Sequence, residues 1–156
     1  MDADPAVVFA GIPISDRLVR WDPQTLGYIS YFDLIPADFG PLKLGEGYWI
    51  TLHQPTTITY QSYPDDAAKS ISLALPGWHL IGQPHSRATE VTQCVLTGAN
   101  APAVCSVMPI YGWNPANLAY WEVGCDGAPI NDSNLLEPWH GYWLCTQQPN
   151  LTLTIP

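Results

Sequence analysis

Charged side chains are scarce in this sequence. They make up 12% of the 156 residues, and only five of them are basic. The net charge at neutral pH is −9, so the surface repels the phosphates of nucleic acids and of anionic lipids. The composition therefore argues against a protein that binds nucleic acids and against one that binds membrane surfaces.

Sequence signatures of catalysis and of metal binding are also missing. There is no Gly-x-Ser-x-Gly, no glycine-rich phosphate loop and no His-Glu-x-x-His, and the loop at 126–134 lacks the ligand pattern of an EF-hand. Several carboxylates could serve in glycoside cleavage, but turn capping or solvation explains each of them equally well. These are Asp22, Asp33, Glu46, Glu122 and Glu137. We expect a protein that is not an enzyme and that holds no metal or cofactor.

Long apolar runs and helical periodicity are absent as well. No run of about 18 apolar residues occurs, so no segment is predicted to span a membrane. Residues 71–75 and 151–155 instead alternate apolar and polar side chains, as half-buried strands do. The 16 prolines and 12 glycines supply frequent turns. We predict an all-β fold of roughly ten short strands, in a sandwich or a barrel.

An internal repeat is present. Three segments recur in the same order along the chain, and repeats of this kind indicate duplicated units. The matching pairs are 11–15 with 82–86, 21–28 (WDPQTLGY) with 113–120 (WNPANLAY), and 47–50 (GYWI) with 141–144 (GYWL). The spacing between the first two matches is 21 residues longer in the second copy, which therefore contains an insertion.

The repeat predicts how the chain is organised. We expect a first unit at 1–60, a connector at 61–69 and a second unit at 70–156, joined in one compact body with internal pseudo-twofold symmetry. The predicted strand at 71–75 opens the second unit, whereas only polar residues stand at the matching place in the first. Either the strand that begins at Ile71 serves both units, or the first unit leaves an edge open beside residues 7–9.

All four cysteines lie in the second unit. An even number without a Cys-x-x-Cys motif predicts disulfides rather than zinc ligands, and disulfides persist in oxidising compartments. The four are Cys94, Cys105, Cys125 and Cys145. Three pairings are possible, and four reduced, buried cysteines are the alternative. We favour Cys94 with Cys105 and Cys125 with Cys145, because the insertion and the repeated framework are then each closed internally.

The repeated motifs resemble a known kind of module. The order Gly-Trp-x-Leu-Ile-Gly-x-Pro, Trp-Asn-Pro and Gly-Tyr-Trp, found here at 77–84, 113–115 and 141–143, is similar to a repeat unit of large secreted and cell-surface proteins of bacteria and archaea. The first unit keeps most of this pattern but has Ala6-Val7 in place of Gly-Trp. The resemblance implies an extracellular β-module appended to larger architectures, and it implies no catalytic residues.

Aromatic side chains are the best candidates for a binding surface. The chain has 7 tryptophans and 8 tyrosines, and exposed aromatic rings stack on sugars and give stiff contact area. Aromatic residues shared by both units are expected to form the core; they are Trp21, Tyr48, Trp49, Trp113, Tyr142 and Trp143. Aromatic residues found in one unit only are the ligand candidates. We select Trp139, Trp121 and Tyr111, together with the adjacent His140, although Trp139 and Trp121 fit a core position equally well.

Two functional hypotheses follow from these patterns. The first is a non-catalytic extracellular module that binds a glycan or another cell-surface polymer through the selected aromatic residues. The alternative is a structural spacer or a self-assembling subunit of a surface layer or filament, in which like subunits pair through an open sheet edge.

Overall fold

Strands dominate the structure, which confirms the predicted all-β class. The computed structural model describes residues 3–15, 17–58, 67–106, 110–125 and 133–156, and residues 61–66 of the predicted connector and most of the loop at 126–134 lie outside them. Twelve strands occur in the described residues. The helices are single turns: α1 (Pro5–Val8), α2 (Pro36–Phe39), η1 (Val91–Gln93) and η2 (Val104–Ser106).

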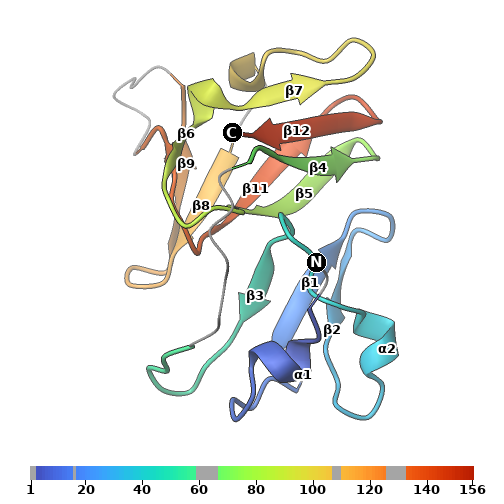
Figure 1. The fold of residues 1–156 in the computed structure, drawn as a ribbon, viewed down its shortest axis with the longest axis vertical. Coiled ribbons are helices and arrows are strands. Elements are labelled where there is room, and N and C mark those ends of the chain that lie inside the picture. The colour runs from blue at the N-terminus through green and yellow to red at the C-terminus, as the bar shows by residue number, and fades with distance from the viewer. Residues whose placement is uncertain (1–2, 16, 59–66, 107–109, 126–132) are drawn as a thin grey trace.

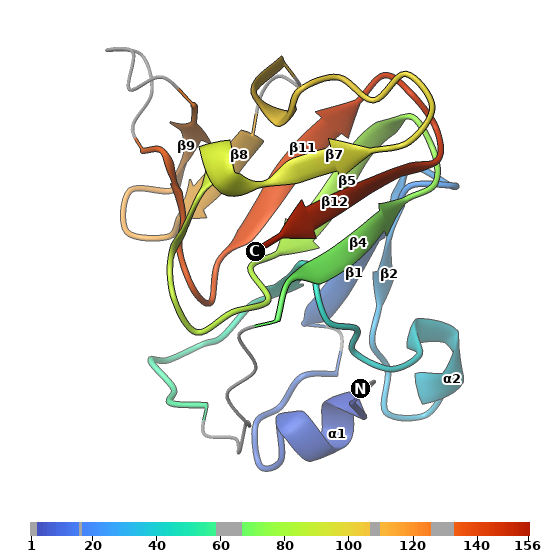
Figure 2. The same cartoon turned by 45° about the horizontal axis from the view of Figure 1, so that its top comes forward.

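Two antiparallel sheets of the second unit face each other as a sandwich. One, which we call the aromatic sheet, has the order β5-β11-β8-β9 and consists of β5 (Gly77–Gly82), β8 (Ile110–Asn114), β9 (Ala119–Val123) and β11 (Gly141–Thr146). The other, the cover sheet, has the order β4-β12-β7 and consists of β4 (Lys69–Leu73), β7 (Val95–Thr97) and β12 (Leu151–Ile155). Figure 2 shows the cover sheet lying over the aromatic sheet. A short pair, β6 (Thr89–Glu90) and β10 (Leu135–Leu136), completes the unit.

The core of the second unit lies between these two sheets. Alternate residues of a strand point to opposite faces, and the burial along β11 and β12 alternates accordingly. Leu151, Leu153 and Ile155 of β12 are buried against Tyr142 and Leu144 of β11 in one hydrophobic cluster. The alternation predicted at 151–155 is therefore confirmed, because it places three apolar side chains on the inner face.

The first unit has a single sheet. Its order is β2-β1-β3, with β1 (Leu18–Asp22), β2 (Gly27–Ser30) and β3 (Tyr48–Ile50). One face of this sheet covers a small second core formed by Ile14, Leu18, Tyr31 and Phe39. Phe39 belongs to α2, and Figure 1 shows α1 and α2 beside the sheet, below the larger second unit.

Strand β5 joins the two units. On one edge it pairs with β11. On its other edge the amide of Gly47 donates to the carbonyl of Leu80 at 3.0 Å, and the amide of Gly82 donates to the carbonyl of Gly45 at 2.8 Å. One of the two predicted arrangements had the strand that begins at Ile71 serving both units. This is corrected: among the described strands β4 pairs only with β12, and the shared strand is β5.

Matching strands of the two units have the same register. In the first unit Trp21 lies opposite Tyr28, and in the second Trp113 lies opposite Tyr120. Likewise Val19 lies opposite Trp49, and the equivalent Tyr111 lies opposite Trp143. The turn geometry is repeated as well, since Leu26 and Leu118 have φ values of 52° and 54°. The repeat in the sequence thus specifies strand order and register, while the pseudo-twofold symmetry stays a prediction.

Two segments of the first unit differ in structure from their counterparts in the second unit. Residues 55–58 resemble the start of β12 in composition but form no strand, and the described part of the first unit contains no counterpart of β4 with which such a strand could pair. Val7 and Val8 belong to α1, so this segment adds no strand to the first-unit sheet, and β3 is an edge strand with β1 as its only strand partner in the described residues. The segment before α1 is tied down by a bridge between Ala3 and Leu42.

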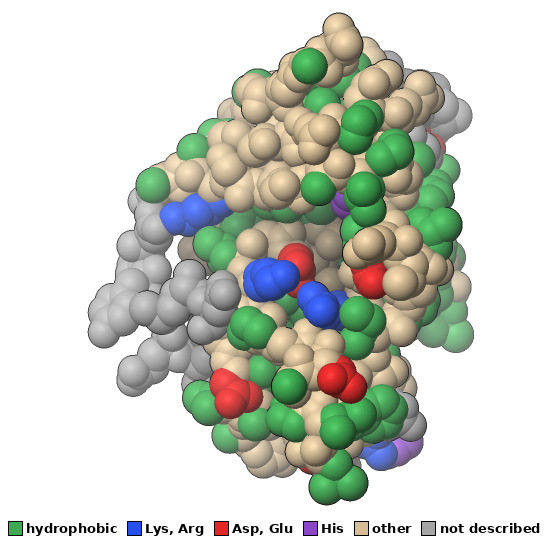
Figure 3. All heavy atoms as spheres, turned by 90° about the vertical axis from the view of Figure 1, so that its right-hand side faces the viewer, with side chains coloured by type: hydrophobic (Ala, Val, Ile, Leu, Met, Phe, Trp, Pro, Cys, Tyr) green, Lys and Arg blue, Asp and Glu red, His purple; other side chains and the backbone are tan. Residues whose placement is uncertain are grey.

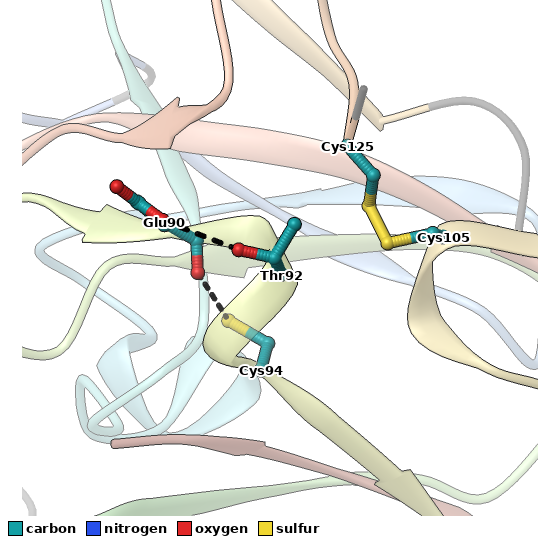
Figure 4. Close-up of a disulfide and its surroundings, with 5 residues drawn as sticks. All are labelled: Glu90, Thr92, Cys94, Cys105 and Cys125. Carbon is teal, nitrogen blue, oxygen red and sulfur yellow. Dashed lines mark hydrogen bonds between the residues drawn. A yellow bond between two sulfur atoms is a disulfide. The ribbon is translucent and has the colours of Figure 1, made fainter. Parts of the chain in front are cut away.

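The predicted disulfide pairing is wrong. Cys105 is bonded to Cys125, and Cys94 and Cys145 are free thiols. Cys125 follows β9, and β8 separates β9 from the strand of Cys145, so the two are about 10 Å apart, beyond the reach of a disulfide. Cys94 points away from the disulfide in Figure 4 and donates to the carbonyl of Glu90 instead. Its burial raises the pKa of the Cys94 thiol to about 11.

A candidate ligand site lined by aromatic side chains

Each unit presents an aromatic sheet face to the other. In the first-unit sheet the face opposite the small core carries Trp21, Tyr28 and Trp49, because residues that lie opposite or two apart share a face. By the same rule, the aromatic sheet turns a set of rings away from the sandwich core. That set is Trp78, Tyr111, Trp113, Tyr120 and Trp143. The aromatic residues of the repeat therefore meet between the two units.

The contacts between the units are reciprocal. Trp21 meets Trp143 edge to face, with ring centroids 5.1 Å apart, and Trp49 meets Trp113 in the same manner at 5.6 Å. Trp21 is the repeat equivalent of Trp113, and Trp49 is that of Trp143, so each contact is the counterpart of the other. We had expected these four tryptophans in the core; this is corrected, since each is only half-buried.

A groove opens at the margin of this interface. Its volume is about 400 Å³, and it is lined by six aromatic side chains, which we call the aromatic groove: Trp21, Tyr28, Trp78, Tyr111, Tyr120 and Trp143. Three of them keep much of their surface in solvent, because Tyr28 is 53% exposed, Tyr120 51% and Trp78 38%. Aromatic surface of this size in one concave place is typical of a binding site.

The rings of the aromatic groove form a floor and steep walls. Trp78 and Tyr111 are closest to parallel, with an angle of 31° between their planes and centroids 6.3 Å apart. Trp143 stands at 88° to Trp78 and at 82° to Trp21. The indole N–H of Trp21 donates to the backbone carbonyl of Trp78 at 2.8 Å, which fixes the wall from the first unit against β5.

The groove contains almost no charge. None of the five basic side chains lines it. Basic side chains occur elsewhere at the junction of the units, where Figure 3 shows them beside acidic ones; Lys43 and Glu46 form an ion pair there at 3.3 Å. Burial raises the pKa of the Tyr28 phenol, as does the nearby Tyr120, so its hydroxyl stays protonated at neutral pH.

Two further cavities lie near the groove, and each shares a lining residue with the one before it. The first, which we call the middle cavity, has a volume of about 500 Å³ and shares Tyr120 with the groove. It is also lined by Asn114, Asn117, Trp121 and His140. The second, of about 530 Å³, shares His140 and contains Trp139 with Val8 and Phe9 of the first unit. Polar side chains that can bond sugar hydroxyls thus lie beside the aromatic groove.

The structure distributes the four sequence-selected residues among these cavities. Tyr111 lies in the aromatic groove. Trp121 packs over Gly112 and edge-on to Tyr142, where it flanks the sandwich core and also lines the middle cavity with His140. Trp139 is 72% exposed at a left-handed φ of 67°, in the place where the first unit has Gly45. Tyr111 is therefore separated from Trp139 by the middle cavity.

Sequence reasoning missed most of the groove. Trp21 and Trp143 are shared by the two units, which was taken as a sign of the core, and Tyr28, Trp78 and Tyr120 were not selected at all. The usable signal was the strand alternation: Trp143 lies between Tyr142 and Leu144, which face the sandwich core, so its own side chain must face away. A shared aromatic residue on an outward face indicates the interface between the units.

Features of other functional classes are not found in the described residues. No group of three or more His, Cys, Asp or Glu side chains lies close enough to hold a metal ion there. No helix among them is long and apolar enough to cross a membrane. Asp22, one of the carboxylates considered for catalysis, accepts from the amide of Gln24 at 2.9 Å and so caps its turn, which lowers its pKa. No family profile, curated protein or solved structure matches this chain at a significant level.

Proposed function

We propose that this protein is an extracellular, non-catalytic recognition module that binds a surface glycan in the aromatic groove. The observation that carries the proposal is the gathering of six aromatic side chains from both units around one concave surface. The disulfide between Cys105 and Cys125 is consistent with an oxidising compartment. The resemblance of the repeated motifs to modules of secreted and cell-surface proteins supports the same location.

The floor of the groove suits the apolar face of a sugar ring. Trp78 and Tyr111 lie side by side at a shallow angle, so their exposed faces offer a platform for stacking. The hydroxyl groups of the sugar remain on the open side, in contact with water. A longer glycan can extend past Tyr120 to the middle cavity, where Asn114, Asn117 and His140 supply hydrogen-bonding groups.

A glycan array with two matched tryptophan variants tests this proposal. The oxidised protein is compared with Trp78→Ala, which removes part of the floor, and with Trp139→Ala, which removes an exposed ring outside the groove. We expect competable binding that falls on the order of tenfold in Trp78→Ala, from the loss of one stacking contact. Trp139→Ala should keep the binding of short glycans.

Two outcomes would contradict the proposal. Loss of binding in Trp139→Ala alone would move the site to the cavity that contains Trp139, as the sequence first suggested. An array on which no glycan binds would exclude the glycan as the ligand and favour the alternative of a self-assembling surface subunit. Sedimentation over a range of concentrations would then decide, because such a subunit must oligomerise as its concentration rises.

A further inference from the structure

We propose that the group recognised in the walled part of the aromatic groove is a quaternary ammonium carried by the surface ligand. This inference rests on the proposed function, because it names the chemical class that the same groove selects. It concerns the corner formed by Trp143, Trp21 and Trp78, beside the flatter floor on which a sugar ring can stack.

The geometry of the walls favours a compact group over a flat one. Trp143 stands nearly perpendicular to Trp21 and Trp78 and at 74° to Tyr28, so ring surfaces surround this corner in several directions. A planar ligand needs faces that are close to parallel. A tetrahedral trimethylammonium group presents a methyl surface in every direction, and it can therefore contact several steeply inclined rings at once.

The hydrogen-bonding capacity of the lining favours a quaternary ammonium over a primary one. The six lining side chains offer only phenol hydroxyls and indole N–H groups, and the N–H of Trp21 is already donated to the carbonyl of Trp78. The three N–H donors of a primary ammonium would have only the phenol oxygens of Tyr28, Tyr111 and Tyr120 as side-chain acceptors, and each buried donor that fails to reach one is costly. A quaternary ammonium has no N–H groups, and so it loses no hydrogen bonds on entering the groove.

The charges around the groove complement a cation. The negative faces of aromatic rings attract positive charge, and no basic side chain lines the groove to oppose it. Glu122 lies opposite Tyr111 across the β8–β9 pair, so its carboxylate projects from the same face of the aromatic sheet. The chain as a whole carries a net charge of −9. An anionic ligand would be repelled by the ring faces, by Glu122 and by the net negative charge of the chain.

Choline and its uncharged carbon isostere, neohexanol, test the inference directly. The two molecules have nearly the same shape and apolar surface, so the difference in their affinities measures the contribution of the positive charge. We expect choline to bind on the order of tenfold more tightly, as is typical of a cation enclosed by aromatic rings. Calorimetry gives the affinities, and chemical-shift changes of the indole N–H groups locate the site.

Variants measure separately how much the aromatic rings and the Glu122 carboxylate contribute to the affinity for choline. Trp78→Leu keeps apolar bulk but removes a ring face, so choline should lose most of its advantage over neohexanol. Trp139→Leu is the matched control outside the groove and should bind choline like the unchanged protein. Glu122→Gln should weaken choline about twofold to threefold and leave neohexanol unchanged, because only the charged ligand senses the carboxylate.

The outcomes separate this inference from the proposed function. Equal affinities for choline and neohexanol, no binding of either, or an unaltered preference for choline in both Trp78→Leu and a second groove variant, Tyr28→Ala, would overturn the quaternary ammonium. In those cases, a glycan array positive for neutral sugars would leave the proposed function standing. Selective choline binding together with a blank array would support the ammonium site and remove the glycan.

Discussion

The two units share a three-stranded framework but differ in what covers its inner face. In the second unit the cover sheet lies over that face, and the joint core contains fifteen buried side chains in the described residues. In the first unit single-turn helices and loops take its place, and the corresponding core contains four. The comparison teaches that the repeat specifies the register of the strands, whereas the added strands decide how much core each unit has.

This difference makes the first unit dependent on the second. A chain of about 60 residues with so small a core is marginally stable by itself. The first unit therefore needs the aromatic interface and the backbone bonds to β5, which bury its second face. The second unit has its own sandwich and a disulfide. Substitutions at equivalent positions should reveal this asymmetry.

The largest effect is expected from the tryptophans of the interface. Trp143 contacts Trp21, Tyr28 and Trp78, whereas the equivalent Trp49 is in contact with Trp113. We expect Trp143→Ala to lower the free energy of unfolding by about 3 kcal/mol, and Trp49→Ala to lower it by less. Urea denaturation followed by circular dichroism measures both. Equal decreases in the free energy of unfolding would mean that Trp143 contributes no more to the interface than Trp49 does.

Removal of the disulfide should have the next largest effect, and it should act on the second unit. The bond joins residues separated by 20 positions, and closing such a loop contributes roughly 3 kcal/mol. The double variant Cys105→Ser, Cys125→Ser should lower the urea midpoint, and a reductant should no longer change it. A control variant with Cys94→Ala and Cys145→Ala should stay sensitive to reductant. An insensitive control would contradict the pairing.

A smaller effect is expected from the tyrosine that follows the turn in each unit. The amide of Glu137 donates to the hydroxyl of Tyr142 at 2.6 Å, and the amide of Lys43 donates to that of Tyr48 at 2.8 Å. Tyr142 is fully buried, and burial raises its pKa to about 12, whereas Tyr48 is half-buried. Replacement by Phe should therefore cost about 1–2 kcal/mol at 142 and less at 48. Thermal unfolding of both variants tests this order, and a reversed order would contradict it.

The smallest effect concerns acid stability of the second unit. His79 is buried, which lowers its pKa below the ordinary value of 6.5, and its Nε2 lies 2.8 Å from the carbonyl of Leu75. Below pH 6.5 the unfolded chain takes up a proton more readily than the native one, so stability should fall as the pH is lowered from 7.5 towards 5. His79→Gln keeps a donor for Leu75 but does not titrate in this range. Its unfolding free energy should depend less steeply on pH, and an unchanged slope would exclude His79 as the cause.

The sequence predicted features that depend on neighbouring residues along the chain. Alternation at 151–155 identified β12. Turn capping was one of the roles considered for Asp22, and its carboxylate does accept from the amide two residues on, as the side chain of Asn114 does in the second copy. The disulfide pairing could not be predicted without the strand order. Because β8 lies between β9 and β11, Cys125 is too far from Cys145 to form a disulfide with it.

The candidate site depended on information that no local pattern contains. Tyr111 was selected because it lacks a counterpart, but its neighbours in the groove come from five strands and from both units. Trp139 was selected for its place beside a turn, and its exposure agrees with that reasoning without assigning it a ligand. How the first-unit sheet faces the aromatic sheet is set by tertiary contacts, and so the groove could not be derived from spacing.

Three glycines lie at the joint, and two of them, Gly47 and Gly82, fix how closely the units approach. A Cβ on Gly47 would lie 2.7 Å from the carbonyl oxygen of Ile81, a Cβ on Gly82 would lie 2.6 Å from that of Glu46, and Gly141 lies beside both. At this joint the two units thus touch through backbone, with no side chain between them, while the tryptophans make the contacts elsewhere in the interface. The backbone contact between the units consequently fixes the width of the groove, whereas the side chains that line it determine which ligand it binds. Related chains that keep these glycines and the interface tryptophans could exchange the exposed rings Tyr28, Trp78 and Tyr120, and thereby change ligands, without altering the width of the groove.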